Sequence, residues 1–385
     1  MEIKPLEVNL DKILHIMPDD KFNDRAVVRF EEVAPGMSGY LVPATSTRPF
    51  EYITSSLIKP MSYAGITSLF DEGRAKVVFF HSLPTRHRHL VRAVPKTTKI
   101  VWIGWGNDYY KTLLRSQFPY PAGLLDPHTI QHFLPNYSKK LPPLRRLKDL
   151  LRFALKSQPS AFSKKDFKRI DYFIPVLKKE YDISRETNPW FTAEYAQWLY
   201  SRKQDERQYE TCVSPNAENV MLGNSASLTN NHLDALRILA EGDKKSFTKL
   251  FCPLSYGDKK VALSVTDLGK YYFGKKFVPL HEFLSKDSYH AIMRTCHTVV
   301  MNHVRQQAGG NINFALNTGV RVVLNPRSVF RGELNSRGLY FDVLGMHRLD
   351  FLPSAHRLHN IKSEAERRAK LANPDILSNL LNKLL

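Results

Sequence analysis

The sequence predicts an α/β protein made of two doubly wound units, each with a largely parallel sheet. Short apolar runs alternate with helical patterns in both halves of the chain, which is the rhythm of such folds. The chain has 385 residues, 43% of them hydrophobic, and so can bury two cores. Polar residues follow several apolar runs directly, as they do where the strands of a parallel sheet end beside a ligand.

In the first half of the chain, four apolar runs are predicted to be strands: 12–17, 39–44, 76–83 and 99–106. Polar turns accompany three of them, containing Asp19 and Asp20, His81 and Ser82, and Trp105, Asp108 and Tyr109. These turns share one edge of a parallel sheet, where a carboxylate or an imidazole could act as a general base towards a hydroxyl. The candidates for this role are Asp20, Asp108 and His81. Each turn alone is more easily explained as a helix cap or a solvated loop, and their combination favours a site.

The second half repeats the pattern, with predicted strands at 219–224, 249–254, 276–280, 297–303 and 320–325. A region rich in basic and aromatic residues, about 139–208, separates the two series. We therefore predict an N-terminal domain at 1–210 and a C-terminal domain at 211–385. The segment "NPDILSNLLNKLL" at 373–385 has leucines at helical spacing, which predicts an amphipathic helix packed on the body of the protein.

The segment "NVMLGNSASLTNNHLDAL" at 219–236 passes from an apolar run through a polar turn into a helical pattern. Gly223 can make the tight turn, Asn224 and Ser225 offer side-chain donors, and Thr229 or Asn230 can cap the helix. The N–H groups at the start of this helix would then point at an anion. By spacing alone an ordinary capped loop is the better explanation, because no established phosphate-binding motif is present.

The segment "NHVRQQAGGNINFALNTGVRVVLNP" at 302–326 has a similar form. A polar loop with Gln306, Gln307 and Gly310 leads to a predicted helix that begins at Asn311. Gln306, Gln307 and Asn311 offer neutral donors and acceptors suited to sugar hydroxyls and phosphate oxygens. Two such turns at the carboxyl ends of strands border one crevice, where they could hold two phosphates and a sugar. A solvated loop explains this segment equally well. In "CPLSYGD", Ser255 and Tyr256 could form a wall for a base or a sugar, although an ordinary loop is the better explanation there.

The formal net charge of +19 implies an anionic partner, which could be nucleic acid, an anionic membrane or a phosphorylated substrate. The segment "LRRLKDLLRFALK" predicts a helix with leucines on one face, surrounded by Arg145, Arg146, Lys148, Arg152 and Lys156. Such a helix can lie in an anionic membrane interface, where each cation contributes about 1 kcal/mol. A helix docked on the core by its leucines is the alternative. Nucleic-acid binding is disfavoured, because no recognisable reader motif occurs.

Cys212, Cys252 and Cys296 lie 40 and 44 residues apart, a spacing that fits neither a zinc site nor a small disulfide framework and predicts a reducing compartment. Acidic residues interrupt the apolar N-terminal segment, and no apolar run reaches about 18 residues, so we expect neither a signal peptide nor a spanning helix. No D-x-D or H-E-x-x-H motif occurs. We therefore predict that the protein requires no metal and no other cofactor.

Four motifs together resemble one enzyme family: "LHIMPDD", "WIGWGNDYY", "GNSASLTNNHLDAL" and "QQAGGNINFALNTGVRVVLN". They are similar to glycosyltransferase family 56, the TDP-N-acetylfucosamine:lipid II N-acetylfucosaminyltransferases of enterobacterial common antigen synthesis. The resemblance extends from about residue 14 to about residue 334, with the motifs in the same order. The chain departs from the family at Asn107, Tyr109 and Ala308, and in a longer basic insert at about 139–168.

The resemblance implies a GT-B fold, in which two Rossmann-like domains face each other across a cleft. It implies a metal-independent hexosyltransferase that moves a deoxyamino sugar from a dTDP-sugar to a polyprenyl-diphosphate-linked saccharide. The enzyme would be a peripheral protein on the cytoplasmic side of the bacterial inner membrane. The alternatives are a transferase with another nucleotide sugar or another acceptor, and a non-catalytic basic module that binds membranes or nucleic acid.

The same resemblance assigns roles to residues that match the family's motifs. The donor would be bound by Gly223, Asn224, Ser225, Asn230, His232, Gln306, Gln307 and Gly310. Asp20 matches the acidic residue after the first strand, and the tryptophan motif matches Trp105, Gly106, Asp108 and Tyr110. Asp20 is our first candidate for the base, because the loop after the first strand commonly faces the reacting carbon in two-domain transferases.

Overall fold

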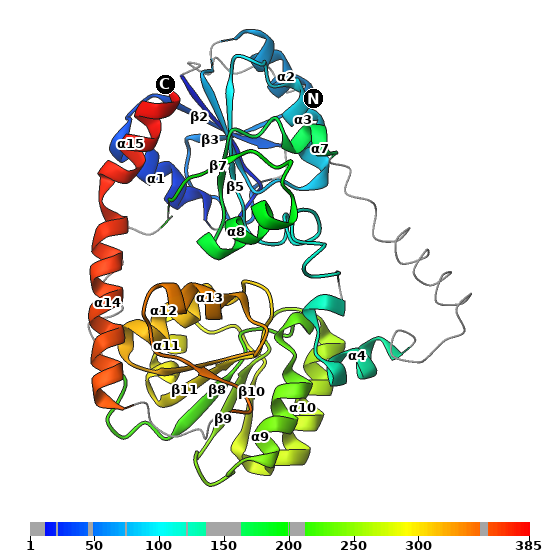
Figure 1. Cartoon of the computed structure of the whole chain (residues 1–385), viewed down its shortest axis with the longest axis vertical. Helices are drawn as coiled ribbons and strands as arrows, with labels where there is room; N and C mark the ends of the chain where they lie inside the picture. Colours follow the sequence, from blue (N-terminus) through cyan, green and yellow to red (C-terminus); the bar gives the residue numbers. More distant parts are fainter. Residues whose placement is uncertain are drawn as a thin grey trace. The chain divides into compact units, whose positions relative to one another are not determined.

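The computed structural model describes residues 12–20, 22–44, 49–73, 75–120, 122–135, 163–198, 200, 212–346 and 353–385. They form two compact units, each containing segments that are far apart in the sequence (Figure 1). Unit 1 comprises residues 1–117, 149–205 and 369–385, and unit 2 comprises residues 118–148 and 206–368.

Unit 1 is built on a seven-stranded sheet with the order β3-β2-β1-β4-β5-β6-β7. All neighbouring strands are parallel. The strands are β1 (Ile13–Ile16), β2 (Ser38–Pro43), β3 (Ile58–Met61), β4 (Val77–His81), β5 (Lys99–Ile103), β6 (Tyr172–Ile174) and β7 (Glu194–Tyr195). The four strands predicted in this half are confirmed. Strands β3, β6 and β7 were not predicted; they are short and lie on the flanks of the sheet.

The helices of unit 1 are α1 (Asn23–Val33), α2 (Tyr63–Asp71), η1 (Thr85–His87), α3 (Arg88–Ala93), α7 (Lys164–Phe167), α8 (Lys178–Thr187) and α15 (Pro374–Leu384). The predicted C-terminal amphipathic helix is confirmed as α15. It lies beside α1 and buries Leu377, Leu380, Leu381 and Leu384 in the core that contains Phe30 and strands β1, β2 and β4 (Figure 1). Each buried leucine contributes about 1.5–3 kcal/mol to this packing.

Unit 2 is built on a six-stranded sheet with the order β10-β9-β8-β11-β12-β13, again entirely parallel. The strands are β8 (Asn219–Leu222), β9 (Leu250–Pro253), β10 (Phe277–Leu280), β11 (Cys296–Met301), β12 (Arg321–Leu324) and β13 (Asp342–Val343). All five predicted strands are confirmed. Strand β13 has two residues, too few for a sequence pattern to show.

The helices of unit 2 are η2 (Ala122–Leu124), α4 (Pro127–Phe133), η4 (Leu228–Asn230), α9 (His232–Glu241), α10 (Lys259–Phe273), η5 (Gly274–Lys276), α11 (Lys286–Arg294), α12 (Gly309–Thr318), α13 (Val329–Ser336) and α14 (Ser354–Ala372). The last residues of α14 belong to unit 1. Helices α9 and α10 lie side by side on the sheet, and α4 packs on α9 (Figure 1).

Both sheets have a point where the strand order reverses. In unit 1 this point lies between β1 and β4, and in unit 2 it lies between β8 and β11. In open parallel sheets ligands bind outside the carboxyl ends of the strands at such switch points. We therefore expect ligand-binding residues in the loops that follow these four strands.

The division into units differs from the predicted domains at 1–210 and 211–385. One crossing, between residues 205 and 206, lies near the predicted boundary. Residues 118–148, however, fall in unit 2, because α4 packs on α9. Residues 369–385 fall in unit 1, because the leucines of α15 join its core. A single boundary in the chain cannot describe units to which segments 118–148 and 369–385 belong in this way.

Candidate active site

The turn after β8 requires a glycine. Gly223 has φ of +69°, a left-handed conformation that residues with a Cβ atom rarely adopt. A Cβ atom at this position would lie 2.4 Å from Nε2 of His232 and 3.3 Å from Oδ1 of Asn230. The backbone N–H of Gly223 donates to the carbonyl of Val300 in β11 at 2.9 Å. The chain thus turns tightly at the switch point of unit 2, against a buried imidazole.

Asn230 closes the loop that follows. Its side-chain amide donates to the carbonyl of Ser225 at 2.8 Å and to the hydroxyl of Ser225 at 3.2 Å. The helix N-cap is Asn231, with φ of 50°, so the predicted cap at Thr229 or Asn230 is wrong. The side chain of Asn231 makes no capping hydrogen bond to the first turn of α9. N–H groups at a helix start favour an anion in general.

Three loops are joined by side-chain hydrogen bonds at this edge of the sheet. Gln307 accepts from the hydroxyl of Thr229 at 2.6 Å and donates to Oδ1 of Asn224 at 3.0 Å. The amide of Asn224 in turn donates to the hydroxyl of Tyr256 at 3.0 Å. The structure therefore brings together the three segments that the sequence analysis selected, which follow β8, β9 and β11.

The loops after β8 and β9 are also joined through their backbones. Ala226 and Gly257 form an isolated parallel bridge, and the N–H of Ala226 donates to the carbonyl of Tyr256 at 2.8 Å. Gly257 has φ of +118°, and a Cβ atom there would lie 2.6 Å from the backbone of Ala226. The bridge holds the ring of Tyr256 in an exposed position, while Ser255 is half-buried in the same loop.

The loop after β11 leads into α12 earlier than predicted. The helix begins at Gly309 instead of Asn311, and its N-cap, Ala308, is left-handed with φ of 54°. Gly310 is exposed, with open space where a Cβ atom would lie. Gln306 is half-buried, and the amide of Asn311 donates to the hydroxyl of Tyr289 in α11 at 2.7 Å. Asn311 therefore has an established structural contact in addition to its predicted role.

Arg305, which directly precedes the two glutamines, was not among the predicted site residues. Its guanidinium contacts the hydroxyl of Thr229 at 3.5 Å and donates to the carbonyl of Gln306 at 3.3 Å. It therefore brings a positive charge to the same group of loops. A cation beside two amides in a loop after a strand is a signal that could have identified it.

Two buried histidines lie behind the turn at Gly223. Burial lowers the pKa of His232 and that of His303 to about 3, so both rings are neutral at pH 7. Both ring nitrogens of His232, Nε2 of His303 and Oδ1 of Asn230 have no hydrogen-bond partner among the described residues. Buried polar atoms normally have partners, so this cluster of polar atoms could hydrogen-bond to a bound water or ligand atom.

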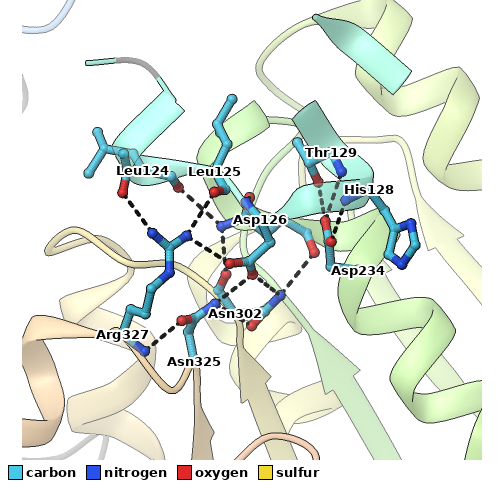
Figure 2. A network of polar contacts seen from close by, with 11 residues as sticks. Leu124, Leu125, Asp126, His128, Thr129, Asp234, Asn302, Asn325 and Arg327 are labelled. Atoms are coloured by element: carbon cyan, nitrogen blue, oxygen red, sulfur yellow. Dashed lines mark hydrogen bonds and ion pairs between the residues drawn. The ribbon is translucent and has the colours of Figure 1, made fainter. Parts of the chain in front are cut away.

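At a neighbouring part of the same edge of the unit 2 sheet, a polar network holds the segment that precedes α4 (Figure 2). Arg327 donates to the carboxylate of Asp126 at 2.8 Å and to the carbonyl of Leu125 at 2.7 Å. The same carboxylate accepts from the amides of Asn302 and Asn325, at the ends of β11 and β12. Burial raises the pKa of Asp126, and Arg327 opposes this shift. The network fixes the segment before α4 to the sheet.

Asp234 of α9 completes this attachment by binding the start of α4. Its carboxylate accepts from the backbone N–H groups of His128 and Thr129, at 2.7 and 2.9 Å, and from the hydroxyl of Thr129 at 2.6 Å. Figure 2 shows the carboxylates of Asp126 and Asp234 near the start of α4. Nothing in the sequence pattern predicted these contacts.

In unit 1, the predicted polar turns follow three adjacent strands, β1, β4 and β5, and therefore lie at one edge, as expected. Asp19 has a structural task, because its carboxylate accepts from the N–H groups of Glu51 and Tyr52 at 2.6 and 3.2 Å. Asp20 is half-buried, and its carboxylate accepts from the N–H of Phe22 at 3.2 Å.

Asp108 joins the loops after β4 and β5. Its carboxylate accepts from the N–H groups of Leu83 and Trp105 at 2.9 and 3.0 Å, and from the indole of Trp102 at 2.8 Å. Burial raises the pKa of Asp108, and these hydrogen bonds oppose the shift. A carboxylate with three protein donors is better suited to holding loops than to accepting a proton from a substrate.

His81 is completely buried at the end of β4. Its Nε2 lies 3.0 Å from Nδ1 of His15, and its Nδ1 lies 3.0 Å from the hydroxyl of Tyr200. Burial lowers the pKa of His81 to about 3. Both nitrogens are engaged inside the protein, which disfavours His81 as the base. Asp20 therefore stays our first candidate for the base.

The predicted membrane-binding residues Arg145, Arg146, Lys148, Arg152 and Lys156 lie outside the residues that the structure describes. No helix in the described part of the chain has the length and hydropathy needed to span a membrane. Within the same described ranges, His, Cys, Asp and Glu side chains form no group of three or more that could hold a metal ion. Metal independence stays a prediction.

The fold is shared with several glycosyltransferases of known structure. A glycosyltransferase from Rickettsia africae has 9% identity to this chain, with 97% of each chain covered and a TM-score of 0.56. A UDP-forming trehalose-phosphate synthase from Burkholderia xenovorans, in complex with glucose-6-phosphate, has 9% identity, with 97% of this chain and 99% of that one covered and a TM-score of 0.57. At such low identity the likeness shows the fold, which is GT-B.

A third similar structure is the Anabaena protein Alr3699/HepE in complex with UDP and glucose. It has 9% identity, with 97% of this chain and 94% of that one covered and a TM-score of 0.52. The model of the family described as 4-alpha-L-fucosyltransferase, glycosyl transferase group 56, matches residues 187–350. This region contains every loop of the unit 2 site, so the resemblance to family 56 is confirmed there, and the protein is a glycosyltransferase. No curated protein matches the chain.

Proposed function

We propose that the protein transfers a deoxyamino sugar of the N-acetylfucosamine type from a dTDP-sugar to a polyprenyl-diphosphate-linked saccharide. The donor half of this proposal rests on the turn at Gly223, which lies at the topological switch point of unit 2. The turn leads through a closed loop to the start of α9. Gln307 and Asn224 join this turn to the loop that precedes α12.

The donor's diphosphate would lie at the start of α9, beside the loop of Arg305 and Gln307. The first N–H groups of a helix and its dipole favour an anion, by about 0.3–1 kcal/mol at exposed sites. In the transition state negative charge grows on the leaving diphosphate, where fixed dipoles and a guanidinium stabilise it most. These groups supply the charge stabilisation that a metal ion would otherwise provide. Tyr256, with its exposed ring, would lie against the nucleobase or the sugar.

The acceptor would be deprotonated by Asp20 in unit 1. Its carboxylate lies in the loop after β1, at the switch point of that sheet, and it is half-buried. A general base must come within hydrogen-bond reach of the hydroxyl that attacks, and the carboxyl ends of β1 and β4 are the usual place for such a ligand.

The lipid-linked acceptor requires contact with a membrane surface. We propose that the basic amphipathic segment with Arg145, Arg146, Lys148, Arg152 and Lys156 supplies it, on the cytoplasmic side of the bacterial inner membrane. The protein would then be a peripheral membrane protein, in keeping with its net charge of +19.

A second donor class is favoured by the solved structures, because their ligands are UDP with glucose in one case and UDP-2-fluoro glucose in another. Thermal stabilisation by dTDP, UDP, GDP and short RNA and DNA at equal concentrations would distinguish the candidates, since a ligand that binds the native state more tightly stabilises it more. We expect the largest shift with dTDP. A larger shift with UDP would indicate a UDP-sugar as the donor instead of a dTDP-sugar. A shift with nucleic acid alone would contradict the transferase site. Product analysis with the matching nucleotide sugar and a lipid-linked acceptor would then test the reaction itself.

A further inference from the structure

A row of hydrogen-bonded side chains crosses the switch point of unit 1. Nδ1 of His15 in β1 lies 3.0 Å from Nε2 of His81 in β4, and Nδ1 of His81 lies 3.0 Å from the hydroxyl of Tyr200. The indole of Trp105 donates to the same hydroxyl at 2.9 Å. The ring of His81, which is itself contacted by His15, and the indole of Trp105 thus hold the phenol oxygen of Tyr200 in place.

The protons in this row have a preferred direction. If Tyr200 donated to His81, then His81 would donate to His15, and Nε2 of His15 would carry a buried proton with no partner among the described residues. In the opposite direction His15 donates to His81, and His81 donates to Tyr200. Every buried N–H of the row is then paired, which is the arrangement that folded proteins strongly prefer. The hydroxyl of Tyr200 accepts two hydrogen bonds, and its own proton is directed to an acceptor outside the row.

The surroundings of Tyr200 have the composition of a ligand site. Tyr200 and Trp105 are half-buried, and Phe22 is 38% exposed, with its ring centroid 5.6 Å from that of Tyr200 and 5.9 Å from that of Trp105. Asp20 is close enough for its charge to contribute to the raised pKa of Tyr200, whose main cause is burial. Aromatic surface with a few fixed polar groups is the usual composition of a small-molecule site.

We propose that Tyr200, Phe22 and Asp20 form the subsite for the acceptor saccharide, an assignment that rests on the proposed transferase function. The hydroxyl of Tyr200 donates to an oxygen of the sugar, and the ring of Phe22 packs on the apolar face of the sugar ring. Asp20 lies beside them to accept the proton of the attacking hydroxyl. His81 touches no substrate and is a positioning residue, which acts by orienting the phenol.

Saccharide binding can be measured without any transfer, by saturation-transfer NMR with a panel of mono- and disaccharides. We expect a signal for the wild-type protein that is strongly reduced in Tyr200→Phe and in Phe22→Ala. The matched control is Tyr172→Phe, because Tyr172 packs on the same core but lies at the amino end of β6. Absence of a signal in the wild type, or an equal signal in Tyr200→Phe and the wild type, would overturn the subsite.

Kinetics then test the role of His81. Loss of one neutral hydrogen bond weakens binding by about 2- to 10-fold, so Tyr200→Phe should raise the KM for the acceptor by that factor while stabilisation by dTDP stays unchanged. His81→Phe should raise the same KM in the wild type and have no further effect in the Tyr200→Phe background. Equal effects in both backgrounds would contradict positioning through Tyr200. Saccharide binding by a wild type that transfers no sugar would instead reject the proposed reaction and leave the subsite standing.

Discussion

Nε2 of His232 lies 2.4 Å from the point where a Cβ atom of Gly223 would be. The change Gly223→Ala therefore adds a methyl group in a left-handed conformation, at about 1–2 kcal/mol, and forces it against a buried ring, at about 1–3 kcal/mol more. We expect a lower free energy of unfolding and the loss of thermal stabilisation by dTDP. Denaturant unfolding and a dTDP titration would measure the two effects.

The matched control for this change is Gly338→Ala. Gly338 has nearly the same backbone conformation, with φ of +65°, but open space lies where its Cβ atom would be. Gly338→Ala should lower the free energy of unfolding only by the cost of the left-handed conformation, and it should bind dTDP normally. If the two variants bind dTDP equally well, the turn at Gly223 is not part of the donor site.

Gln307→Glu tests the polar bridge between the donor loops. The new carboxylate cannot donate to Asn224, and it brings a negative charge to the proposed diphosphate site. Hydrogen bonds to charged groups contribute about 1.5–3 kcal/mol, so the affinity for dTDP should fall about 10- to 100-fold. Gln131→Glu, on the exposed face of α4, makes the same chemical change and should leave dTDP binding intact. Calorimetric titration would compare the variants, and equal affinities would exclude Gln307 from the site.

Asp20→Asn should separate catalysis from donor binding. A carboxylate that assists proton removal contributes typically about 10²- to 10⁴-fold, so turnover should fall by about that factor while dTDP affinity, a property of unit 2, stays nearly unchanged. Asp108→Asn is expected to act differently, because the amide offers fewer acceptor sites to three donors. It should lower the free energy of unfolding by about 1–3 kcal/mol. Normal turnover in Asp20→Asn would contradict our assignment of the base.

Acid should destabilise the protein already at mildly acidic pH. Burial lowers the pKa of His81, His87, His232 and His303 to about 3, from an ordinary value of 6.5. Between these values the unfolded chain binds more protons than the native protein, so stability is lost as the pH falls below about 6.5. Each histidine adds about 1.4 kcal/mol per pH unit to the slope.

Urea unfolding at about pH 7.5, 6.5 and 5.5 would measure this dependence. His87→Asn is a suitable comparison, because His87 lies outside both proposed sites, and its removal should lower the slope by about one proton. A free energy of unfolding that is constant over this range would show that these rings gain protons without unfolding.

The membrane prediction concerns residues outside the described part of the chain. Changing Arg145, Arg146 and Arg152 to Glu should release the protein from anionic vesicles, since each cation contributes about 1 kcal/mol near such a surface. The control changes Arg86, Lys96 and Lys165 to Glu, which alters the net charge equally at exposed, dispersed positions of unit 1. Vesicle sedimentation at low and high salt would compare the two. Equal vesicle binding by both triple variants would contradict the prediction that the basic segment binds the membrane.

Buried runs of apolar residues made most of this fold predictable, since the strands next to both switch points, β1, β4, β8 and β11, lie in such runs. The donor loops were predictable for the same reason, because they directly follow those strands. Strands of two or three residues, such as β7 and β13, carry no periodicity that could be recognised.

The contacts that could not be predicted join residues far apart in the chain. His81 and Tyr200 are 119 residues apart, and Asp126 and Arg327 are 201 residues apart. Local patterns contain no information on such pairs. Internal contacts also engage His81 and Asp108 in holding the protein together, which leaves Asp20 as the candidate base.

Helix α15 has a consequence for the order in which the protein can be made. Leu377, Leu380, Leu381 and Leu384 belong to the core that also contains Ile13 and Phe30. A ribosome must therefore complete unit 2 before the residues that close the core of unit 1 exist. During that time the apolar surface of α1 and its neighbouring strands lacks its cover, although domains commonly fold in order from the N-terminus during synthesis. The core of unit 1 can therefore be completed only after unit 2 has been synthesised.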